Sequence, residues 1–255
     1  IGAEFARQYA ALGWDLALTA RREDRLNELA NDLGYKYGVT VIRIPQDLAR
    51  ANSADKIIAA LSEQGRHVDA LINNAGYGLP GTFFNTSWKS QAEFIRVLYT
   101  APIELAHKVL PGMAERKYGR IINVASLAGY AAGNAGHTLY ASVKSGLIKF
   151  SESLNAECDA LGHTDIHCTA LCPGFTWSEF HDVNGTREQT NKMPKWMWME
   201  AEPVVKAGID AVNRGQPVVV PGMANKTIAT LTRILPEPLG RAIVKAQSRN
   251  YRRMD

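Results

Sequence analysis

Cysteine is scarce in this chain, and its few thiols follow no pattern. The chain has three cysteines among 255 residues, with no C-x-x-C pair, which argues against a disulfide framework and against a thiol redox motif. His167 and Cys168 would point to opposite faces of a strand, so they cannot share a metal ion. We therefore expect no metal site, and a reducing cytoplasmic compartment.

Long hydrophobic runs, low-complexity linkers and a strong net charge are also absent. No apolar run approaches the roughly 18 residues that a membrane span needs. The net charge of +4 comes from scattered Lys and Arg residues, and the cluster of Arg249, Arg252 and Arg253 is typical of a solvated helix end. The sequence predicts neither a nucleic-acid partner nor a membrane role.

What the sequence does contain is a regular alternation of apolar runs and amphipathic helices. Strands are predicted within residues 15–20, 39–47, 68–76, 119–126, 166–174 and 216–222. Helices are predicted within 1–13, 21–34, 51–65, 90–117, 140–161, 203–213 and 228–253, with Gly34 closing the second and a bend at Pro102. Such alternation is typical of βαβ units. We therefore predict an α/β fold with a doubly wound parallel sheet, in a single domain over residues 1–255.

The long irregular stretch of the sequence lies within residues 174–201. Long loops inside compact α/β domains are usually functional, so we expect a substrate lid at about 175–201. This segment is rich in Trp and Met, including Trp196 and Trp198. These side chains would line a pocket for an apolar substrate, pack the lid onto the core, or form a subunit contact.

Tyr140 and Lys144 are four residues apart at the start of a predicted helix, so their side chains share one helix face. Ser126 ends the preceding strand, at the edge where open α/β sheets bind ligands. A nearby ammonium lowers the pKa of a tyrosine, which is otherwise about 10. Tyr140 can then exchange a proton with a substrate oxygen while the Ser126 hydroxyl donates to that oxygen.

Y-x-x-x-K alone is common by chance, but here other motifs accompany it in a fixed order. N-N-A-G at residues 73–76 and C-P-G at residues 172–174 each follow a predicted strand. The order N-N-A-G, Ser126, Y-x-x-x-K and P-G resembles the short-chain dehydrogenase/reductase family over essentially the whole chain. The resemblance implies a Rossmann-type sheet and transfer of a hydride between a nicotinamide and a carbonyl or alcohol substrate. It also implies a homodimer or homotetramer.

The same resemblance assigns roles to individual residues. It implies that Tyr140 is the general acid/base, that Ser126 binds the substrate oxygen, and that Lys144 binds the nicotinamide ribose and lowers the pKa of Tyr140. Along the cofactor it places Gly2, Asp47, Leu48, Asn74, Ala75, Gly76, Tyr140, Lys144, Pro173, Gly174, Thr176 and Ser178.

The chain opens inside an amphipathic helix with no capping residue ahead of it. Family members begin with a strand and a loop of the form T-G-x-x-x-G-I-G, and Ile1 and Gly2 look like its last two residues. The resemblance thus implies that the first strand and glycine loop, about 15 to 25 residues, are missing from the given sequence. Gly2 would mark the pyrophosphate end of the helix.

Arg21 and Arg22 follow the first predicted strand, where an NAD-dependent protein usually has an acidic residue. An arginine pair suits a 2′-phosphate, so the sequence predicts NADP. The alternative is an ordinary basic helix start, although cations are unfavourable at a helix N-terminus.

Leu98 is the main departure from the family pattern, because the family has an Asn there that organises a water beside the lysine. This change leaves a rival interpretation, a non-catalytic nucleotide-binding regulatory protein of the same fold. Epimerase or dehydratase chemistry is a third possibility. The identity of the substrate, beyond a preference for apolar groups, is not encoded in these motifs.

Overall fold

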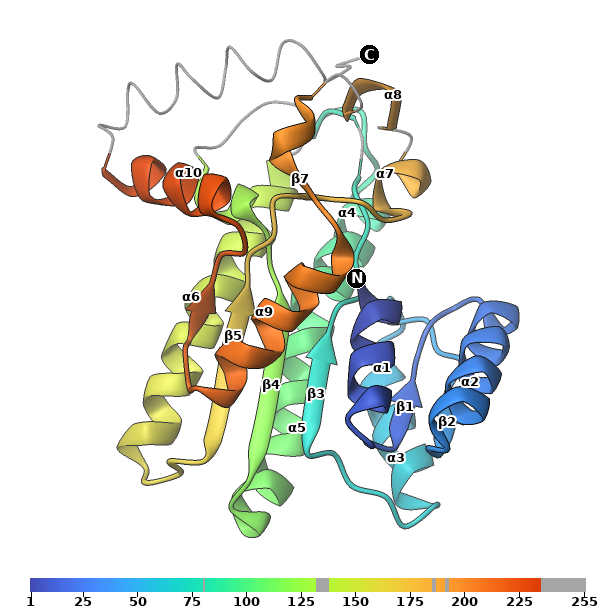
Figure 1. Ribbon diagram of the computed structural model, residues 1–255. Coiled ribbons are helices and arrows are strands. Elements are labelled where there is room, and N and C mark those ends of the chain that lie inside the picture. Colours follow the sequence, from blue (N-terminus) through green and yellow to red (C-terminus); the bar gives the residue numbers. More distant parts are fainter. Residues whose placement is uncertain (80, 132–137, 185–186, 191–192, 235–255) are drawn as a thin grey trace.

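The computed structural model describes residues 1–79, 81–131, 138–184, 187–190 and 193–234 (Figure 1). The predicted cluster of Arg249, Arg252 and Arg253 lies outside the described residues, as does most of the predicted C-terminal helix. The helices are α1 (Gly2–Ala11), α2 (Glu23–Tyr37), α3 (Ser53–Ser62), α4 (Trp88–Ile95), α5 (Ala101–Arg116), α6 (Thr138–Ala160), α7 (Phe180–Val183), α8 (Arg187–Thr190), α9 (Ala201–Asn213) and α10 (Met223–Ile234). The strands are β1 (Leu16–Leu18), β2 (Val41–Arg43), β3 (Ala70–Asn73), β4 (Gly119–Val124), β5 (Ile166–Leu171), β6 (Phe175–Thr176), β7 (Trp198–Met199) and β8 (Val218–Val219).

The strands are parallel, as the alternation in the sequence predicts. One sheet has the order β3-β4-β5-β8, and β1 pairs with β2 in a second sheet. Among the described residues, neither β1 nor β3 has a hydrogen-bonded strand on the edge that faces the other. The expected strand ahead of Ile1 lies outside this sequence and stays a prediction.

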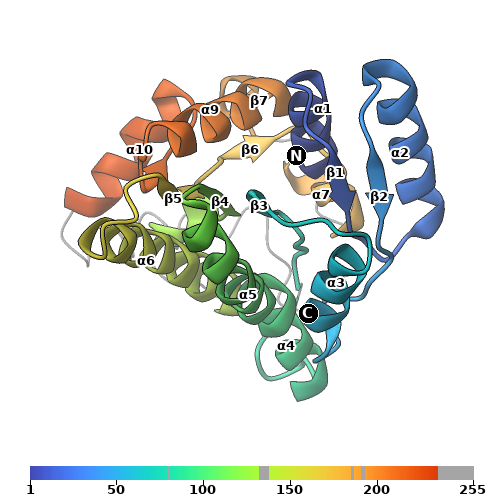
Figure 2. The same cartoon turned by 90° about the horizontal axis from the view of Figure 1, so that it is seen from below.

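Helices cover both faces of the strands (Figure 2). Helices α1, α2 and α9 lie on one face, and α3, α5 and α6 lie on the other. Every residue of β4 is buried, which is typical of a strand in the middle of a doubly covered parallel sheet. The doubly wound α/β architecture is therefore confirmed.

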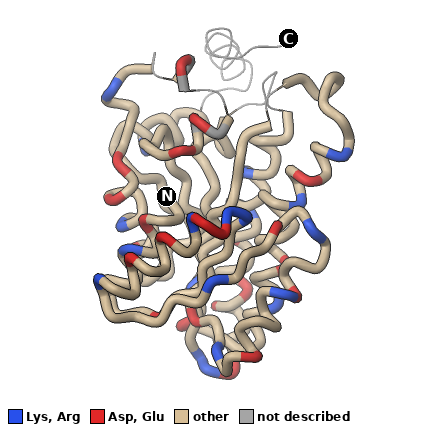
Figure 3. The backbone as a smooth tube through the Cα atoms, turned by 90° about the vertical axis from the view of Figure 1, so that its right-hand side faces the viewer, with Lys and Arg blue, Asp and Glu red and all other residues tan. Residues whose placement is uncertain are grey.

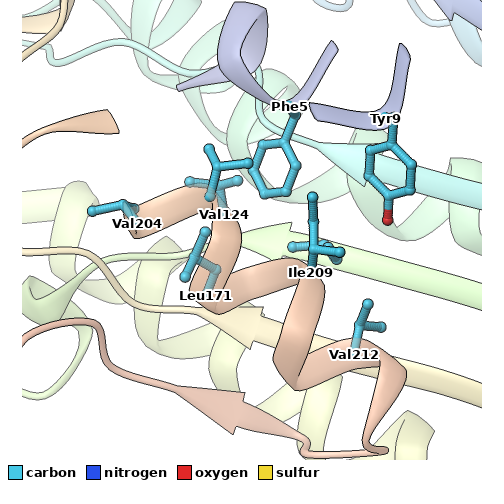
Figure 4. Packing of buried hydrophobic residues seen from close by; sticks show 9 residues of the cluster. Phe5, Tyr9, Val124, Leu171, Val204, Ile209 and Val212 are labelled. Carbon is cyan, nitrogen blue, oxygen red and sulfur yellow. The ribbon is translucent and has the colours of Figure 1, made fainter. Parts of the chain in front are cut away.

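The core on the α1 and α9 side holds the first helix against the sheet. Phe5 and Tyr9 are four residues apart on α1 and therefore share a face. They pack with Val124 at the end of β4, Leu171 at the end of β5 and Ile209 of α9 (Figure 4). This packing fixes the N-terminus of α1 near the carboxyl ends of β4 and β5.

Two boundaries differ from the sequence-based predictions. Helix α2 does not close at Gly34 but continues to Tyr37, and Gly38 ends it with a left-handed backbone (φ 69°) and an N–H bond to the Gly34 carbonyl. That conformation suits glycine, so the second glycine is the helix stop. Strand β4 ends at Val124, so Ser126 follows the strand instead of closing it.

The long helical stretch predicted at residues 90–117 comprises α4 and α5, and the predicted bend at Pro102 stays a prediction. Residues Arg96–Thr100 form a π-helical turn between α4 and α5. Pro102 then lies in the first turn of α5, directly after this π-helical turn. The turn includes Leu98, the position that departs from the family pattern.

The predicted lid is less irregular than its composition suggests. It contains the short turns α7 and α8, and β6 pairs with β7 through Phe175–Trp198 and Thr176–Met199. In Figure 1 these elements lie above the carboxyl ends of β3, β4 and β5. The lid thus covers the edge of the sheet at which ligands bind in α/β folds.

Charged residues are spread over the surface. Lys and Arg are interspersed with Asp and Glu on the side shown in Figure 3. None of the described helices is both long enough and apolar enough to cross a membrane. Within the described ranges, no group of three or more His, Cys, Asp or Glu side chains is arranged to hold a metal ion.

Candidate active site

Ser126 is held in the loop after β4 by main-chain bonds on both sides. The Ala125 N–H donates to the Leu171 carbonyl at 2.7 Å, and the Leu127 N–H donates to the Pro173 carbonyl at 2.8 Å. The Ser126 hydroxyl accepts a bond from the Ala128 N–H at 3.1 Å. It thereby caps a single 3₁₀ turn, Leu127–Gly129. The serine is positioned by the loops after two central strands.

The same 3₁₀ turn packs directly against α6, the helix that carries the other predicted catalytic residues. A Cβ on Gly129 would be 2.7 Å from Ile148 Cδ1 and 3.0 Å from the Lys144 carbonyl carbon, so only glycine allows this approach. The close packing brings Ser126 to Tyr140, and their side chains form a hydrogen bond. The structure thus joins two residues that are 14 positions apart in the sequence.

Lys144 is 5% exposed and bound to the end of β4. Its Nζ donates to the Val124 carbonyl at 2.7 Å and lies 5.8 Å from the centroid of the Tyr140 ring. Burial lowers the pKa of Lys144 from 10.5 to about 8, because desolvation disfavours the charged ammonium. The lysine is therefore fixed between the sheet and the tyrosine.

The pKa of Tyr140 differs from the sequence-based expectation, which was that Lys144 would lower it. Burial is the dominant cause and raises the pKa of Tyr140, while the hydrogen bond with Ser126 acts in the opposite direction. Desolvation opposes the phenolate charge more strongly than the serine stabilises it. In this structure the phenol is kept in its protonated form, which is the form that donates a proton.

A buried polar network joins the strand ends beneath these side chains. The Asn73 amide donates to Asn123 Oδ1 at 2.8 Å and to the Pro102 carbonyl at 3.2 Å. The Asn123 amide donates in turn to Ser151 Oγ at 2.9 Å. Each of these three side chains is at least 91% buried, where an unpaired amide would be costly. The network therefore fixes β3, β4, α5 and α6 relative to one another.

Leu98 places an apolar side chain beside this arrangement. It is 1% exposed and packs in a cluster with Phe94, Val97 and Val143. A Cβ on Gly76 would lie 3.7 Å from Leu98 Cγ and 3.9 Å from Lys144 Nζ. The leucine side chain thus lies near the lysine and offers no hydrogen-bonding group there.

All of the predicted catalytic and cofactor-binding residues line one cavity of about 2430 Å³. The catalytic candidates Ser126, Tyr140 and Lys144 line it together with Gly2, Arg21, Arg22, Asp47, Leu48, Asn74, Ala75, Gly76, Pro173, Gly174, Thr176 and Ser178. The cavity extends from the arginines after β1 to the tyrosine on α6. The arginines and the tyrosine thus line one continuous cavity.

Two glycines in this lining make room for amide side chains. A Cβ on Gly2 would collide with Asn74, and a Cβ on Gly174 would collide with Asn225 of α10. Asn225 is 4% exposed and donates to the Pro221 carbonyl at 2.9 Å. Sequence analysis missed Asn225, because it lies about 50 residues beyond Gly174 in a helix with no recognisable motif.

Polar contacts order the predicted lid and join it to distant segments. Thr176 donates to the Gly174 carbonyl and Ser178 to the Thr176 carbonyl, both at 3.3 Å. Asn184, at the end of α7, accepts a bond from the Gly78 N–H at 2.7 Å. Glu179 pairs with Arg22 and Arg25. Neither Asn184 nor Glu179 was predicted, since nothing in the local pattern links them to segments that are more than 100 residues away.

The Trp and Met side chains of the predicted lid have different surroundings, so some pack the lid and others line the cavity. Trp177 stacks on Trp198 with ring centroids 4.1 Å apart, and Trp198 is buried. Met193 and Met197 line the cavity, whereas Trp196 is 66% exposed. The tryptophan pair therefore packs the lid, and the two methionines contribute apolar surface to the cavity.

The chain is similar to known dehydrogenases and reductases. The family model described as short chain dehydrogenase matches residues 1–189. Dehydrogenase/reductase SDR family member 7B of Danio rerio is 30% identical over 246 residues, covering 92% of this chain and 78% of that protein. An uncharacterized oxidoreductase of Myxococcus xanthus is 30% identical over 239 residues, covering 94% and 90% respectively.

Solved structures share the fold. A short-chain dehydrogenase from Sphingobium yanoikuyae in complex with NADPH is 28% identical, with a TM-score of 0.77 and coverage of 92% of both chains. A 7beta-hydroxysteroid dehydrogenase is 21% identical, with a TM-score of 0.82 and coverage of 95% of this chain and 91% of that one.

The family match covers most of the chain, and the Ser126, Tyr140 and Lys144 side chains meet at the carboxyl ends of the sheet. Sequence motifs, fold and relatives agree. The chain belongs to the short-chain dehydrogenase family, whose members are oxidoreductases that bind a nicotinamide cofactor and transfer a hydride to or from a small molecule.

Proposed function

We propose that this oxidoreductase uses NADP and interconverts a carbonyl compound and its alcohol. The observation that carries the proposal is one cavity with two chemically different ends. The hydrogen-bonded Ser126 and Tyr140 lie at one end beside Lys144, and Arg21 and Arg22 lie at the other. A dinucleotide has the same polarity, because its reactive ring and its adenosine phosphate are at opposite ends.

The cavity lining suits a nicotinamide dinucleotide in several places. Gly2 begins α1, whose first N–H groups favour a pyrophosphate. Asp47, Leu48, Asn74, Ala75 and Gly76 also line the cavity, as do Pro173, Gly174, Thr176 and Ser178. When bound there, NADPH would supply the hydride. The NADPH complex of the Sphingobium yanoikuyae relative supports this choice of cofactor.

The remaining chemistry falls to the chain's own side chains. Ser126 donates a hydrogen bond to the substrate oxygen and polarises the carbonyl. Tyr140, kept protonated by burial, gives its Oη proton to that oxygen in reduction and takes it back in oxidation. Lys144 would hold the ribose hydroxyls of the bound cofactor, and its Nζ lies near the Tyr140 ring. Leu98 supplies no polar group for a proton relay at its position.

The substrate in this proposal is apolar around its reacting carbon. Phe175, Trp177, Phe180, Met193 and Met197 line the lid side of the cavity. Such surfaces bind hydrocarbon groups, while the serine and tyrosine select an oxygen at the reacting carbon.

The comparisons give no support to the non-catalytic alternative. A single domain, a homodimer or homotetramer, and a cytoplasmic location belong to the same proposal, and light scattering of the purified protein tests the oligomeric state.

The choice of cofactor is tested by removing one arginine. We expect Arg22→Ala to weaken NADPH binding by about 10-fold, which is the loss of one charge-assisted hydrogen bond, and to leave NADH binding unchanged. Fluorescence titration of the wild type and the variant with both cofactors measures the two dissociation constants.

Arg43→Ala is the matched control, because Arg43 is an exposed arginine on β2 that does not line the cavity. It should leave both affinities unchanged. If the wild type binds NADH as tightly as NADPH and Arg22→Ala weakens both equally, the NADP assignment is wrong.

A further inference from the structure

The Glu179 carboxylate forms ion pairs with two arginines at the N-terminus of α2, Arg22 and Arg25. Its Oε2 lies 3.1 Å from Arg22 Nη2, and its Oε1 lies 3.4 Å from Arg25 Nη1. Each carboxylate oxygen thus forms an ion pair with one guanidinium group. Arg22 is the N-cap of α2 and Arg25 lies one turn further on, where cations oppose the helix dipole and need an anion nearby. Glu179 provides that anion in this structure.

Glu179 belongs to the lid and not to the nucleotide-binding half of the chain. It precedes α7, and the next residue, Phe180, has its ring centroid 6.2 Å from that of Tyr140. At the end of α7, Asn184 accepts the bond from the Gly78 N–H. The adjacent residues Glu179 and Phe180 therefore contact the arginine pair and the tyrosine, respectively. Both ends of the cavity are touched by this one segment of the lid.

The ion pairs with Glu179 are of the kind that a stronger anion displaces. All three side chains are more than half exposed, at 56% to 58%, and exposed pairs contribute little because water and salt screen them. A phosphate monoester carries almost two negative charges and three acceptor oxygens. It would bind the two guanidinium groups more strongly than one carboxylate does.

We propose that Glu179 is a specificity-determining residue which competes with the 2′-phosphate of NADPH for Arg22 and Arg25. This inference rests on the proposed use of NADP. Binding of the phosphate breaks the contact between the lid and α2, whereas NADH has no group that displaces Glu179 from the arginines. The carboxylate thus weakens NADPH binding and links the choice of cofactor to the position of the lid.

Glu179→Gln tests the proposal, because it removes the charge and keeps the shape. We expect NADPH affinity to rise by about 2- to 5-fold, because an exposed ion pair contributes up to about 1 kcal/mol and would no longer compete with the phosphate; NADH affinity should be unchanged. Glu188→Gln is the control: Glu188 is an exposed acid of the same lid, in α8, with no ion pair among the described residues. It should change neither affinity.

A double-mutant cycle separates competition from a general effect on the lid. In an Arg22→Ala/Arg25→Ala background, Glu179→Gln should have no effect on NADPH affinity, because the groups for which it competes are gone. A gain that persists in this background overturns the proposal, as does an equal gain for NADH in the single variant.

The two proposals fail in different ways. If the wild type prefers NADPH and Glu179→Gln leaves that preference unchanged, only the role of Glu179 is wrong. If neither the wild type nor Glu179→Gln prefers NADPH, the NADP assignment is wrong and the competition falls with it. A preference that emerges only in Glu179→Gln supports the competition.

Discussion

Replacing Tyr140 with phenylalanine should lower kcat by about 10²- to 10⁴-fold, the usual contribution of a general acid/base. The ring would keep its contacts with Phe94 and Phe180, so the expected loss is chemical and not structural. The variant should bind NADPH like the wild type. A panel of aldehydes and ketones, with oxidation of NADPH followed by absorbance, provides the measurement.

Tyr35→Phe is a suitable control for the loss of a hydroxyl. Tyr35 lies on α2 and is 95% exposed, so its variant should turn over at the wild-type rate. Undiminished carbonyl reduction by Tyr140→Phe would show that another group transfers the proton. A variant that loses NADPH binding together with turnover would instead give Tyr140 a role in holding the cofactor.

Lys144 should make the stability of the protein depend on pH. Its pKa is about 8 when folded and 10.5 when exposed, so the unfolded chain binds more protons between these values. The contribution of Lys144 to the free energy of unfolding therefore rises as pH increases from about 8 to 10.5. The shift corresponds to about 3 kcal/mol. Below pH 8 the buried ammonium carries its full destabilising cost.

The comparison with Lys144→Met isolates this contribution from other titrating groups. The difference in unfolding free energy between variant and wild type should change by about 3 kcal/mol in favour of the wild type between pH 7 and pH 10.5. Urea denaturation at several pH values measures it. Lys149→Met is the control, because the Lys149 side chain is 73% exposed. Its difference from the wild type should not change with pH in this way. A Lys144→Met difference that is constant with pH would contradict the burial argument.

The fold class could be predicted from the sequence, and so could the position of the predicted site residues in one cavity. Buried parallel strands have continuous apolar runs, and residues that follow such strands share one edge of the sheet. These patterns therefore predict that Ser126 and Tyr140 lie close together. Their catalytic roles are still predictions, which the variants above test.

Other features depend on packing between distant segments, which local patterns do not encode. The pKa of Tyr140 follows from its burial beneath the lid and beside the 3₁₀ turn, so the residue four positions away could not predict its direction. The contact of Glu179 with Arg22 joins positions 157 residues apart. The end of α2 was misplaced because Gly34 and Gly38 are both plausible stops, and only the backbone angle of the second one decides between them.

The predicted site residues lie on elements that are far apart in the chain. Arg21 and Arg22 follow β1, whereas Ser126 follows β4 and Tyr140 and Lys144 lie on α6. A dinucleotide that contacted all of them would hold these elements together. Amide hydrogens of β1 and β2 should then exchange with solvent more slowly after NADPH is added, while those of the fully buried β4 should already be protected without it.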